Sequence, residues 1–408
     1  MILECEELFD GVGWHGPSEI VIESGDIACV RHAGEPGACS TSEALRVNTV
    51  IPGLVDFGVS ASGYAETPSP IDPFLPERAF ARMSLRYGIT TLVDVNNSSG
   101  PLSYLETLGD LGEGPRLFHS GGRLASRPTG RHDIMVTRDN LDRCLAAVVQ
   151  SGATLLSLGM CEPEIASRVE RWAIEAGIPL TISSQIAPEV PGLQTICGGG
   201  NGSDEEGARS RLYVAPQLNA SAHWTVRGIL DAPNGHFASP VLPHCRNFLR
   251  GRGRIGRRVA EPIVGRYYPN RDERLLDPRI EDVAKAALVR RECVASSSAG
   301  TTGMVPGLSL WSELDRLASL AESRATVLAA ATSVPAEVMA MSRGGRSIGM
   351  VAAGFSADLL VTRGGSTASP VDLLRGLSMV VRAGQMLEVS DLADEVDDMI
   401  AKALRGEL

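Results

Sequence analysis

Residues 52–60, Pro-Gly-Leu-Val-Asp-Phe-Gly-Val-Ser, open a long run of alternating strand-like and helix-like segments. A helical pattern at 77–87 precedes the buried strand pattern 88–95, Gly-Ile-Thr-Thr-Leu-Val-Asp-Val. The same alternation continues in the helix 139–151, the strand 153–159, the helix 163–176 and the strand 178–182. Repeated βα units with parallel strands indicate a doubly wound sheet or a (β/α)8 barrel. Hydrophobic periodicity alone does not choose between these two folds.

Both ends of the chain carry strand patterns. Residues 18–31 alternate apolar and polar side chains around a Ser-Gly-Asp turn, which is typical of a β-hairpin. A second hairpin is expected from Ile348–Val351, the turn Gly354–Ala357 and the strand Asp358–Thr362. We therefore expect a small β-domain that is built from both ends of the chain.

Composition excludes several classes of protein. A net charge of -11 over 408 residues argues against general nucleic-acid binding, because phosphate neutralisation needs a basic face. The sequence contains no run of about 18 apolar residues that would predict a membrane span. The acidic start Met1–Glu7 does not resemble a secretory signal. The eight cysteines contain no Cys-x-x-Cys pair, which favours reduced thiols and a cytoplasmic location.

The motifs along the chain resemble those of the amidohydrolase superfamily, in its imidazolonepropionase-like and prolidase-like branch. Residues 52–60 are similar to the signature Pro-Gly-Leu-Ile-Asp-x-His-x-His, and Gly88-Ile89-Thr90-Thr91 matches the second barrel strand. Further matches are Ile22–Ile27, Ala299–Gly303, Pro306-Gly307, Glu313-Leu314, Ala329–Thr332, Pro335-Ala336, Ile348-Gly349 and Gly354–Leu359. The resemblance implies a distorted (β/α)8 TIM barrel at 51–345, a composite β-sandwich domain from 1–50 and 346–390, and a C-terminal helix at 391–408.

The same resemblance indicates a missing metal site. The family binds divalent metals through side chains on strands one, four, five, six and eight. The matching positions here are Gly58 and Ser60, the segment Leu155–Gly159, Ser183, less securely Cys197, and Thr302. Thr302 stands for an aspartate that is both ligand and general base. None of the seven histidines forms a His-x-His or His-x3-His pair. We therefore expect neither a metal nor any other cofactor.

Three residues are candidates for catalysis. His132 occupies the place of a histidine in a substrate-binding loop of the related branch, and Asp133 beside it could tune its pKa for proton transfer. The alternative is a loop histidine that caps backbone groups. Glu162 follows the fourth strand and could act as a base. It is also suited to the first turn of the next helix, where a carboxylate favours the helix dipole.

Eight polar residues are candidates for substrate contacts at the mouth of the barrel. They are Ser60, Asp94, Ser183, Gln185, Gln217, Asn219, His223 and Thr302. Asp94 ends the second strand, where the family often has an aspartate with a structural role. Residues 246–274 carry nine arginines and three acids, which indicates either a clamp for a carboxylate or phosphate or a solvated loop.

Three functions remain open from the sequence. The first is a metal-independent enzyme that carries out a cyclisation, dehydration or isomerisation on a small organic molecule. The arginine-rich, lysine-poor composition is that of a GC-rich bacterial genome and favours bacterial specialised metabolism. The second is a non-catalytic homologue that binds a ligand or a partner subunit, and the third is a hydrolase with a relocated metal site. The expected partner is a small-molecule substrate, which includes anionic and carrier-bound molecules. The superfamily often forms homo-oligomers, so a homo-oligomer is also expected.

Overall fold

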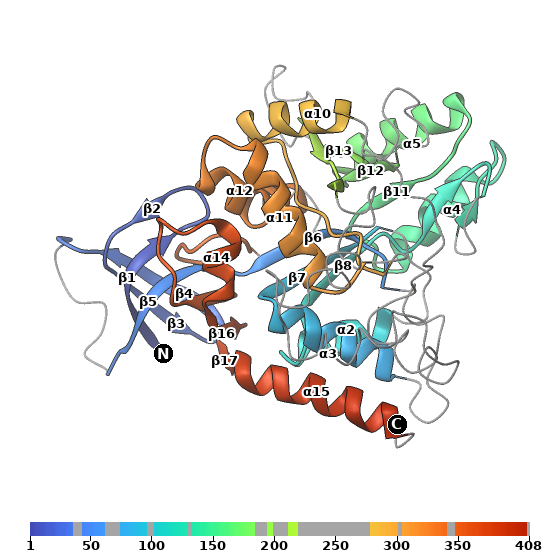
Figure 1. The fold of residues 1–408 in the computed structure, drawn as a ribbon. Helices are drawn as coiled ribbons and strands as arrows, with labels where there is room; N and C mark the ends of the chain where they lie inside the picture. Colours follow the sequence, from blue (N-terminus) through green and yellow to red (C-terminus); the bar gives the residue numbers. More distant parts are fainter. Residues whose placement is uncertain are drawn as a thin grey trace.

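The structure is a computed structural model of mixed α/β architecture (Figure 1). It describes residues 1–35, 43–61, 74–95, 102–128, 133–183, 194–198, 211–218, 278–300, 304–340 and 347–405. These residues form an eight-stranded, a six-stranded and a three-stranded sheet with helices packed on them. In this part of the chain, no helix is long and apolar enough to cross a membrane.

The eight-stranded sheet is built from both ends of the chain, as the sequence predicts. Its order is β17-β16-β15-β5-β1-β3-β4, with β2 paired to β1. The strands are β1 (Ile2–Phe9), β2 (Trp14–His15), β3 (Ser18–Glu23), β4 (Asp26–His32), β5 (Leu45–Pro52), β15 (Leu359–Thr362), β16 (Leu377–Arg382) and β17 (Gln385–Glu388). Figure 1 shows these blue and red strands together at one end of the molecule. The hairpin expected at 18–31 is therefore confirmed as β3 and β4.

Two details of this sheet differ from the sequence prediction. Residues 348–351 form no strand, and β15 pairs instead with β5 and β16. The pattern Ile-Gly-Met-Val predicted a strand wrongly, because Ile348 and Val351 are buried in the core without joining a strand ladder. Val351 N makes a single backbone hydrogen bond, to Asp10 O at 2.9 Å. The eight strands also belong to one sheet, which curls until the backbone of Gly25 accepts a hydrogen bond from Ala357 N at 2.9 Å. The curled sheet encloses a small apolar core of its own.

The three-stranded sheet contains the stretch that decides the fold. Strands β6 (Leu54–Val59), β7 (Ile89–Asp94) and β8 (Arg116–His119) run parallel. Helices α2 (Leu75–Arg86) and α3 (Leu102–Asp110) follow the first two strands. The expected helix 77–87 and strand 88–95 are confirmed. All three strands contribute to the main apolar core.

The six-stranded sheet has the order β10-β9-β11-β12-β13-β14. Its strands are β9 (Arg123–Ala125), β10 (Asp133–Met135), β11 (Leu156–Leu158), β12 (Leu180–Ser183), β13 (Gln194–Gly198) and β14 (Arg211–Ala215). Helices α4 (Leu141–Gln150) and α5 (Pro163–Ala176) cover one of its faces. The sequence sets the ends of α5, because Pro163 suits the first helical turn and Gly177, with φ of 65°, ends the helix in the left-handed region.

The direction of β13 departs from the predicted repeat of parallel strands. It runs antiparallel to both β12 and β14. The prediction assumed that every strand in the middle of the chain belongs to a βα unit. Residues 293–299 then connect the two sheets, because Val294 N donates to Val214 O at 2.9 Å and Ser60 N donates to Ala299 O at 2.7 Å.

The remaining helices complete the fold. They are α10 (Pro278–Val289), α11 (Leu308–Leu320), α12 (Arg324–Ala330), α13 (Ser333–Ala340), α14 (Pro370–Arg375) and α15 (Val389–Arg405). The C-terminal helix α15 lies along α2 (Figure 1), and Arg82 of α2 pairs with Glu395 of α15 at 2.9 Å. Its apolar residues Leu392 and Val396 are buried in the main core.

Candidate functional site

The carboxyl ends of the parallel strands are the place where this type of fold carries functional groups. Strands β6, β7 and β8 end at Val59, Asp94 and His119. Strands β11, β12 and β14 end at Leu158, Ser183 and Ala215. Most of the residues that the sequence singled out follow one of these ends.

A buried carboxyl group joins β6 to the segment 293–299. Asp56 is fully buried, and its Oδ1 accepts a hydrogen bond from Ser297 N at 2.9 Å. Its Oδ2 accepts from Ser297 Oγ at 2.5 Å, and that hydroxyl oxygen accepts from Ala299 N at 2.9 Å. Burial raises the pKa of Asp56 from 3.8 to about 6, although the hydrogen bonds from Ser297 lower it. The sequence analysis used Asp56 only as part of a fold motif.

Ser60 and Asp94 lie together at the ends of β6 and β7. Asp94 is buried, and its Oδ2 accepts a hydrogen bond from Ala61 N at 2.6 Å. Ser60 is 6% exposed, and its carbonyl oxygen lies so close to Gly300 that a Cβ there would approach it to 1.8 Å. The backbone at Gly58 has φ of 96°, a conformation that favours glycine. Asp94 therefore fixes the backbone after β6, and its role as a substrate contact stays a prediction.

Gln217 follows the end of β14 and lies beside the segment 293–299. Its backbone has φ of 49°, and its Nε2 donates to Ser296 Oγ at 3.3 Å. The next residue, Leu218, donates its N–H to Oε1 of the buried Glu313 at 2.9 Å. The fold thus brings Gln217, Ser296, Ser297 and Asp56 into one hydrogen-bonded sector, of which only Gln217 was singled out for substrate binding.

Asp133 and Glu162 lie in a second sector, formed by β9, β10 and β11. Asp133 Oδ1 accepts from Arg123 Nε at 2.7 Å and its Oδ2 accepts from Arg123 Nη2 at 3.1 Å, which makes a bidentate ion pair. Glu162 is exposed at the start of α5, and its N–H donates to Ser126 Oγ at 2.7 Å. Burial raises the pKa of the nearby Cys161 thiol, and the carboxylates of Asp133 and Glu162 raise it further.

Several predicted site residues lie outside the described part of the chain. These are His132, Gln185, Asn219, His223 and Thr302, together with the arginine-rich segment 246–274. Ser183 ends β12 and pairs with Gln194 on β13. Cys197, which the sequence analysis matched to the sixth-strand ligand, pairs with Leu180 at the opposite end of β12. An antiparallel strand reverses the edge at which its last residues lie, and the sequence analysis did not anticipate that reversal.

Sequence reasoning also missed a buried histidine at the end of β8. His119 is 4% exposed, its Nδ1 accepts from Gly121 N at 3.1 Å, and its Nε2 lies 3.0 Å from Glu106 Oε1. Burial lowers the pKa of His119 below 6.5, although Glu106 raises it. Its position directly after the strand pattern 116–118 was the available signal.

Comparison with known proteins shows the fold. No protein-family model matches the chain, and no curated protein matches it. Among solved structures, a bottromycin amidohydrolase matches with a TM-score of 0.65 and 17% identity, covering 99% of this chain and 90% of that one. A Xaa-Pro dipeptidase with methionine in its active site matches with a TM-score of 0.62 and 16% identity, covering 95% and 99%. The ochratoxinase of A. niger matches with a TM-score of 0.60 and 13% identity, covering 95% of each chain.

The chain has the fold of the amidohydrolases. That fold implies a metal centre, so the available donor groups decide whether one fits. Within the residues that the structure describes, no three His, Cys, Asp or Glu side chains gather as a metal site. Asp56 and Asp94 accept hydrogen bonds from Ser297 and Ala61, and Gly58 and Ser60 supply no imidazole. The described residues of this amidohydrolase fold therefore do not fit a zinc site.

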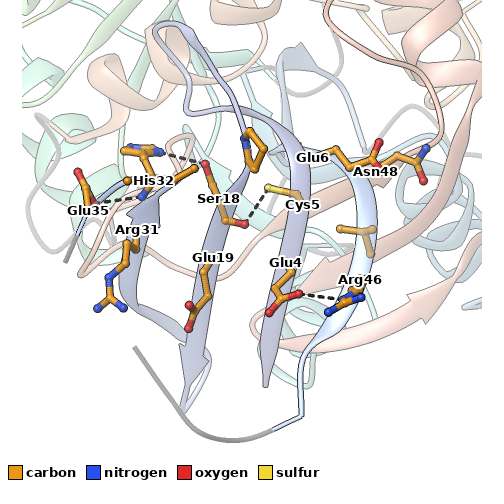
Figure 2. Close-up of a pocket in the computed structure, with 14 residues that line it drawn as sticks. Glu4, Cys5, Glu6, Ser18, Glu19, Arg31, His32, Glu35, Arg46 and Asn48 are labelled. Atoms are coloured by element: carbon orange, nitrogen blue, oxygen red, sulfur yellow. Dashed lines mark hydrogen bonds and ion pairs between the residues drawn. The ribbon is translucent and has the colours of Figure 1, made fainter. Parts of the chain in front are cut away.

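A pocket of 490 Å³ lies on the eight-stranded sheet (Figure 2). It is lined by residues of β1, β3, β4 and β5 and the loops beside them, and it contains none of the residues at the strand ends described above. Glu4 and Arg46 form an ion pair at 3.1 Å across neighbouring strands, as Figure 2 shows. The pocket is therefore separate from the candidate site.

Proposed function

We propose that this chain is a metal-independent enzyme of the amidohydrolase fold. It carries out a non-hydrolytic step, a cyclisation, dehydration or isomerisation, on a small organic molecule. The observation that supports the proposal is the set of side chains at the ends of the strands that could donate to a metal. Where the fold family has imidazole and carboxylate ligands, this chain has Gly58, Ser60 and Thr302, while hydroxyl and amide side chains keep the site polar. Such groups suit positioning and proton transfer better than metal binding.

The proposal includes a distorted (β/α)8 barrel at residues 51–345. This barrel is a separate domain from the β-domain that the two ends of the chain form. It is supported by the connection through 293–299, because Phe57 N donates to Ala295 O at 3.3 Å and Val214 pairs with Cys293. Between β8 and β11, Thr154 N donates to His119 O at 3.0 Å. These bonds continue the strand-to-strand contacts around the core, with antiparallel β13 as the distortion.

In this proposal His132 and Glu162 transfer protons, with Asp133 beside His132. Asp133 is held by the two hydrogen bonds from Arg123, so its orientation is fixed before a substrate arrives. Ser60, Asp94, Ser183, Gln185, Gln217, Asn219, His223 and Thr302 contact the substrate. The enzyme acts in the cytoplasm as a homo-oligomer. The absence of disulfides at the six described cysteines supports the cytoplasm.

Elemental analysis of the full chain, purified without chelator, tests the proposal. We expect zinc, iron, manganese and nickel well below one atom per chain, and unchanged activity after treatment with a chelator. Stoichiometric metal that is needed for activity would refute it. Replacing His132→Asn and Glu162→Gln should then lower turnover without lowering thermal stability, with the exposed Glu164→Gln on α5 as the matched control.

A metal-dependent hydrolase is the second candidate. It is favoured by the fold neighbours, which are named as a dipeptidase, an amidohydrolase and an ochratoxinase. The same elemental analysis separates the two candidates, because the hydrolase needs a bound metal to activate water.

A further inference from the structure

The pocket on the eight-stranded sheet is accessible to small molecules (Figure 2). Its volume of 490 Å³ lies within the range of small-molecule sites, about 300–1,000 Å³. It is open to solvent, because the lining side chains of Arg46 and Glu4 are 87% and 46% exposed. A ligand can therefore enter it without any rearrangement of the core.

Four neighbouring strands place a row of charged side chains along this pocket. Glu4 on β1 pairs in register with Arg46 on β5 and with Glu19 on β3. Glu19 in turn pairs with Arg31 on β4. Residues that pair in register lie side by side on the same face of a sheet. Two carboxylates therefore lie next to each other at the centre of the row, as Figure 2 shows, with one guanidinium group at each end.

The two central carboxylates repel each other. Like charges directly opposite in an antiparallel pair are destabilising, because their Cβ atoms lie only about 5 Å apart. Arg46 Nε lies 3.1 Å from Glu4 Oε2, but an ion pair this exposed contributes little. Glu19 is half-buried, and in the described part of the chain its covered Oε1 has no hydrogen-bond partner. A cation in the pocket would relieve the repulsion between Glu4 and Glu19.

The lining as a whole has an excess of negative charge. Its charged groups are four carboxylates and two guanidinium groups, from Glu4, Glu6, Glu19, Glu35, Arg31 and Arg46. Between Glu35 and Arg46 the only charged residue of the sequence is Glu43. This connection therefore adds no positive charge to the pocket.

The lining also includes a histidine whose neutral form offers a hydrogen-bond acceptor. Ser18 Oγ donates to Gly16 O at 2.9 Å, because a carbonyl oxygen only accepts. The hydroxyl oxygen therefore accepts from His32 Nδ1, which lies 3.0 Å away. With its proton on Nδ1, the neutral imidazole of His32 has a lone pair on Nε2. Carboxylates and this imidazole together favour a ligand that donates hydrogen bonds.

An organic cation fits these acceptors better than a metal ion. Among the described residues, no three His, Cys, Asp or Glu side chains gather as a metal site. The acceptors are spread over neighbouring strands, which lie about 4.8 Å apart. Pro17 and Ala33, both exposed, also line the pocket and offer apolar surface for an alkyl chain.

We propose that this pocket binds a small alkyl ammonium compound. Its ammonium group lies between Glu4 and Glu19 and donates to both carboxylates. The alkyl chain contacts Pro17 and Ala33. Because the pocket lies apart from the strand ends, ligand binding here is independent of the proposed function.

Titration of the full chain with n-butylammonium chloride tests this site, at neutral pH and constant ionic strength. Labelled alanine and valine methyl groups report on the pocket, since Ala33 and Val47 both line it. We expect saturable NMR shifts at these two residues. The compounds 1-butanol and butyrate have the same alkyl chain with a neutral or a negative group, and neither should give saturable shifts.

Replacing the central carboxylate should weaken binding without harming the fold. Glu19→Gln should weaken binding of n-butylammonium about two- to fivefold, the contribution of one exposed charge pair. Without the probe, the urea midpoint of this variant should stay the same or rise, because the repulsion from Glu4 is lost. Glu23→Gln is the matched control, because Glu23 is an exposed glutamate on the same strand that does not line the pocket.

Equal weakening by the two glutamine variants would overturn the site, because the probe would then respond only to the net charge of the chain. Shifts that rise without saturation would also overturn it. Equal binding of 1-butanol would overturn its assignment to an ammonium group. A chain that needs a metal for turnover, but binds n-butylammonium through Glu19, refutes the metal-independent enzyme and leaves the site standing.

Discussion

Asp56 and Asp358 are two aspartates with almost no exposed surface and opposite surroundings. Asp358, which precedes β15, accepts from Arg382 Nη1 at 3.1 Å and from Arg116 Nη2 at 3.3 Å. Arg382 also donates to the carbonyl oxygens of Gly114 and Gly109, at 3.1 and 2.9 Å. This network ties the eight-stranded sheet to the chain between α3 and β8.

Among its described contacts, Asp56 is bound by a hydroxyl and a backbone N–H, both from Ser297. Asp358 is thus bound by charged donors, and Asp56 by neutral ones. A buried carboxyl group bound only by neutral donors resists ionisation. The ion pairs of Asp358 with Arg382 and Arg116 form a structural joint, whereas Asp56 is a titratable group. The joint lies between the sheets, and the titratable group lies in the sector at the strand ends.

Breaking the joint should have the largest effect on stability. Arg382→Met removes one of the two guanidinium groups from Asp358 and leaves the carbonyl oxygens of Gly109 and Gly114 without this donor. We expect the free energy of unfolding to fall by about 3–5 kcal/mol, because a buried charge loses a partner. Urea denaturation measures it. The surface pair Arg375–Asp372 gives the control, since Arg375→Met should cost less than about 1 kcal/mol. Equal losses would remove the distinction between joint and surface.

The fold could be predicted to a large extent from the sequence. The helix at 163–176 agrees to the residue, because Pro163 and Gly177 mark its ends and the apolar residues Ile165, Val169 and Ala173 recur along one face. The strand 88–95 was recognisable as a buried run that follows a helix. Local signals of this kind do not report strand direction, and for that reason the antiparallel course of β13 was missed.

The candidate site was predicted less completely. Gln217 and Ser60 follow strands, so their location at the strand ends follows from the fold. Asp56 and Arg123 were missed because their roles depend on partners far away in the chain, such as Ser297, which lies 241 residues from Asp56. The pairing of Arg123 with Asp133 spans ten residues, but it needs the parallel register of β9 and β10. A single sequence shows neither contact.

A change of pH should alter the contribution of Asp56 to the free energy of unfolding. The pKa of Asp56 is raised from 3.8 to about 6, so the folded state binds more protons than the unfolded state between these values. The stability contribution of Asp56 is therefore highest at low pH and falls as the pH rises, by about 3 kcal/mol across this window. Asp56→Asn should remove that fall, seen as a smaller difference in urea midpoint between pH 4.5 and 7. An unchanged difference would show that other groups cause the dependence.

Removing one hydroxyl should have a smaller effect that depends on the charge of Asp56. Ser297→Ala deletes the donor at 2.5 Å from Asp56 Oδ2 and the acceptor of Ala299 N. Above the pKa of Asp56 the lost bond is to a carboxylate, so we expect a cost of about 1.5–3 kcal/mol at pH 8. The cost should be smaller at pH 4.5, because a protonated carboxyl loses only a neutral bond.

The neighbouring Ser296→Ala is the matched control for this variant. Ser296 is buried like Ser297, and its hydroxyl accepts from the uncharged Gln217 Nε2 at 3.3 Å. Its loss should cost about 1 kcal/mol at both pH values, because neither partner titrates. If the two alanine variants show the same dependence on pH, Asp56 is not the group that titrates in this sector. If only Ser297→Ala responds to pH, the hydroxyl of Ser297 stabilises the ionised form of Asp56, as the lowering effect of its hydrogen bond requires.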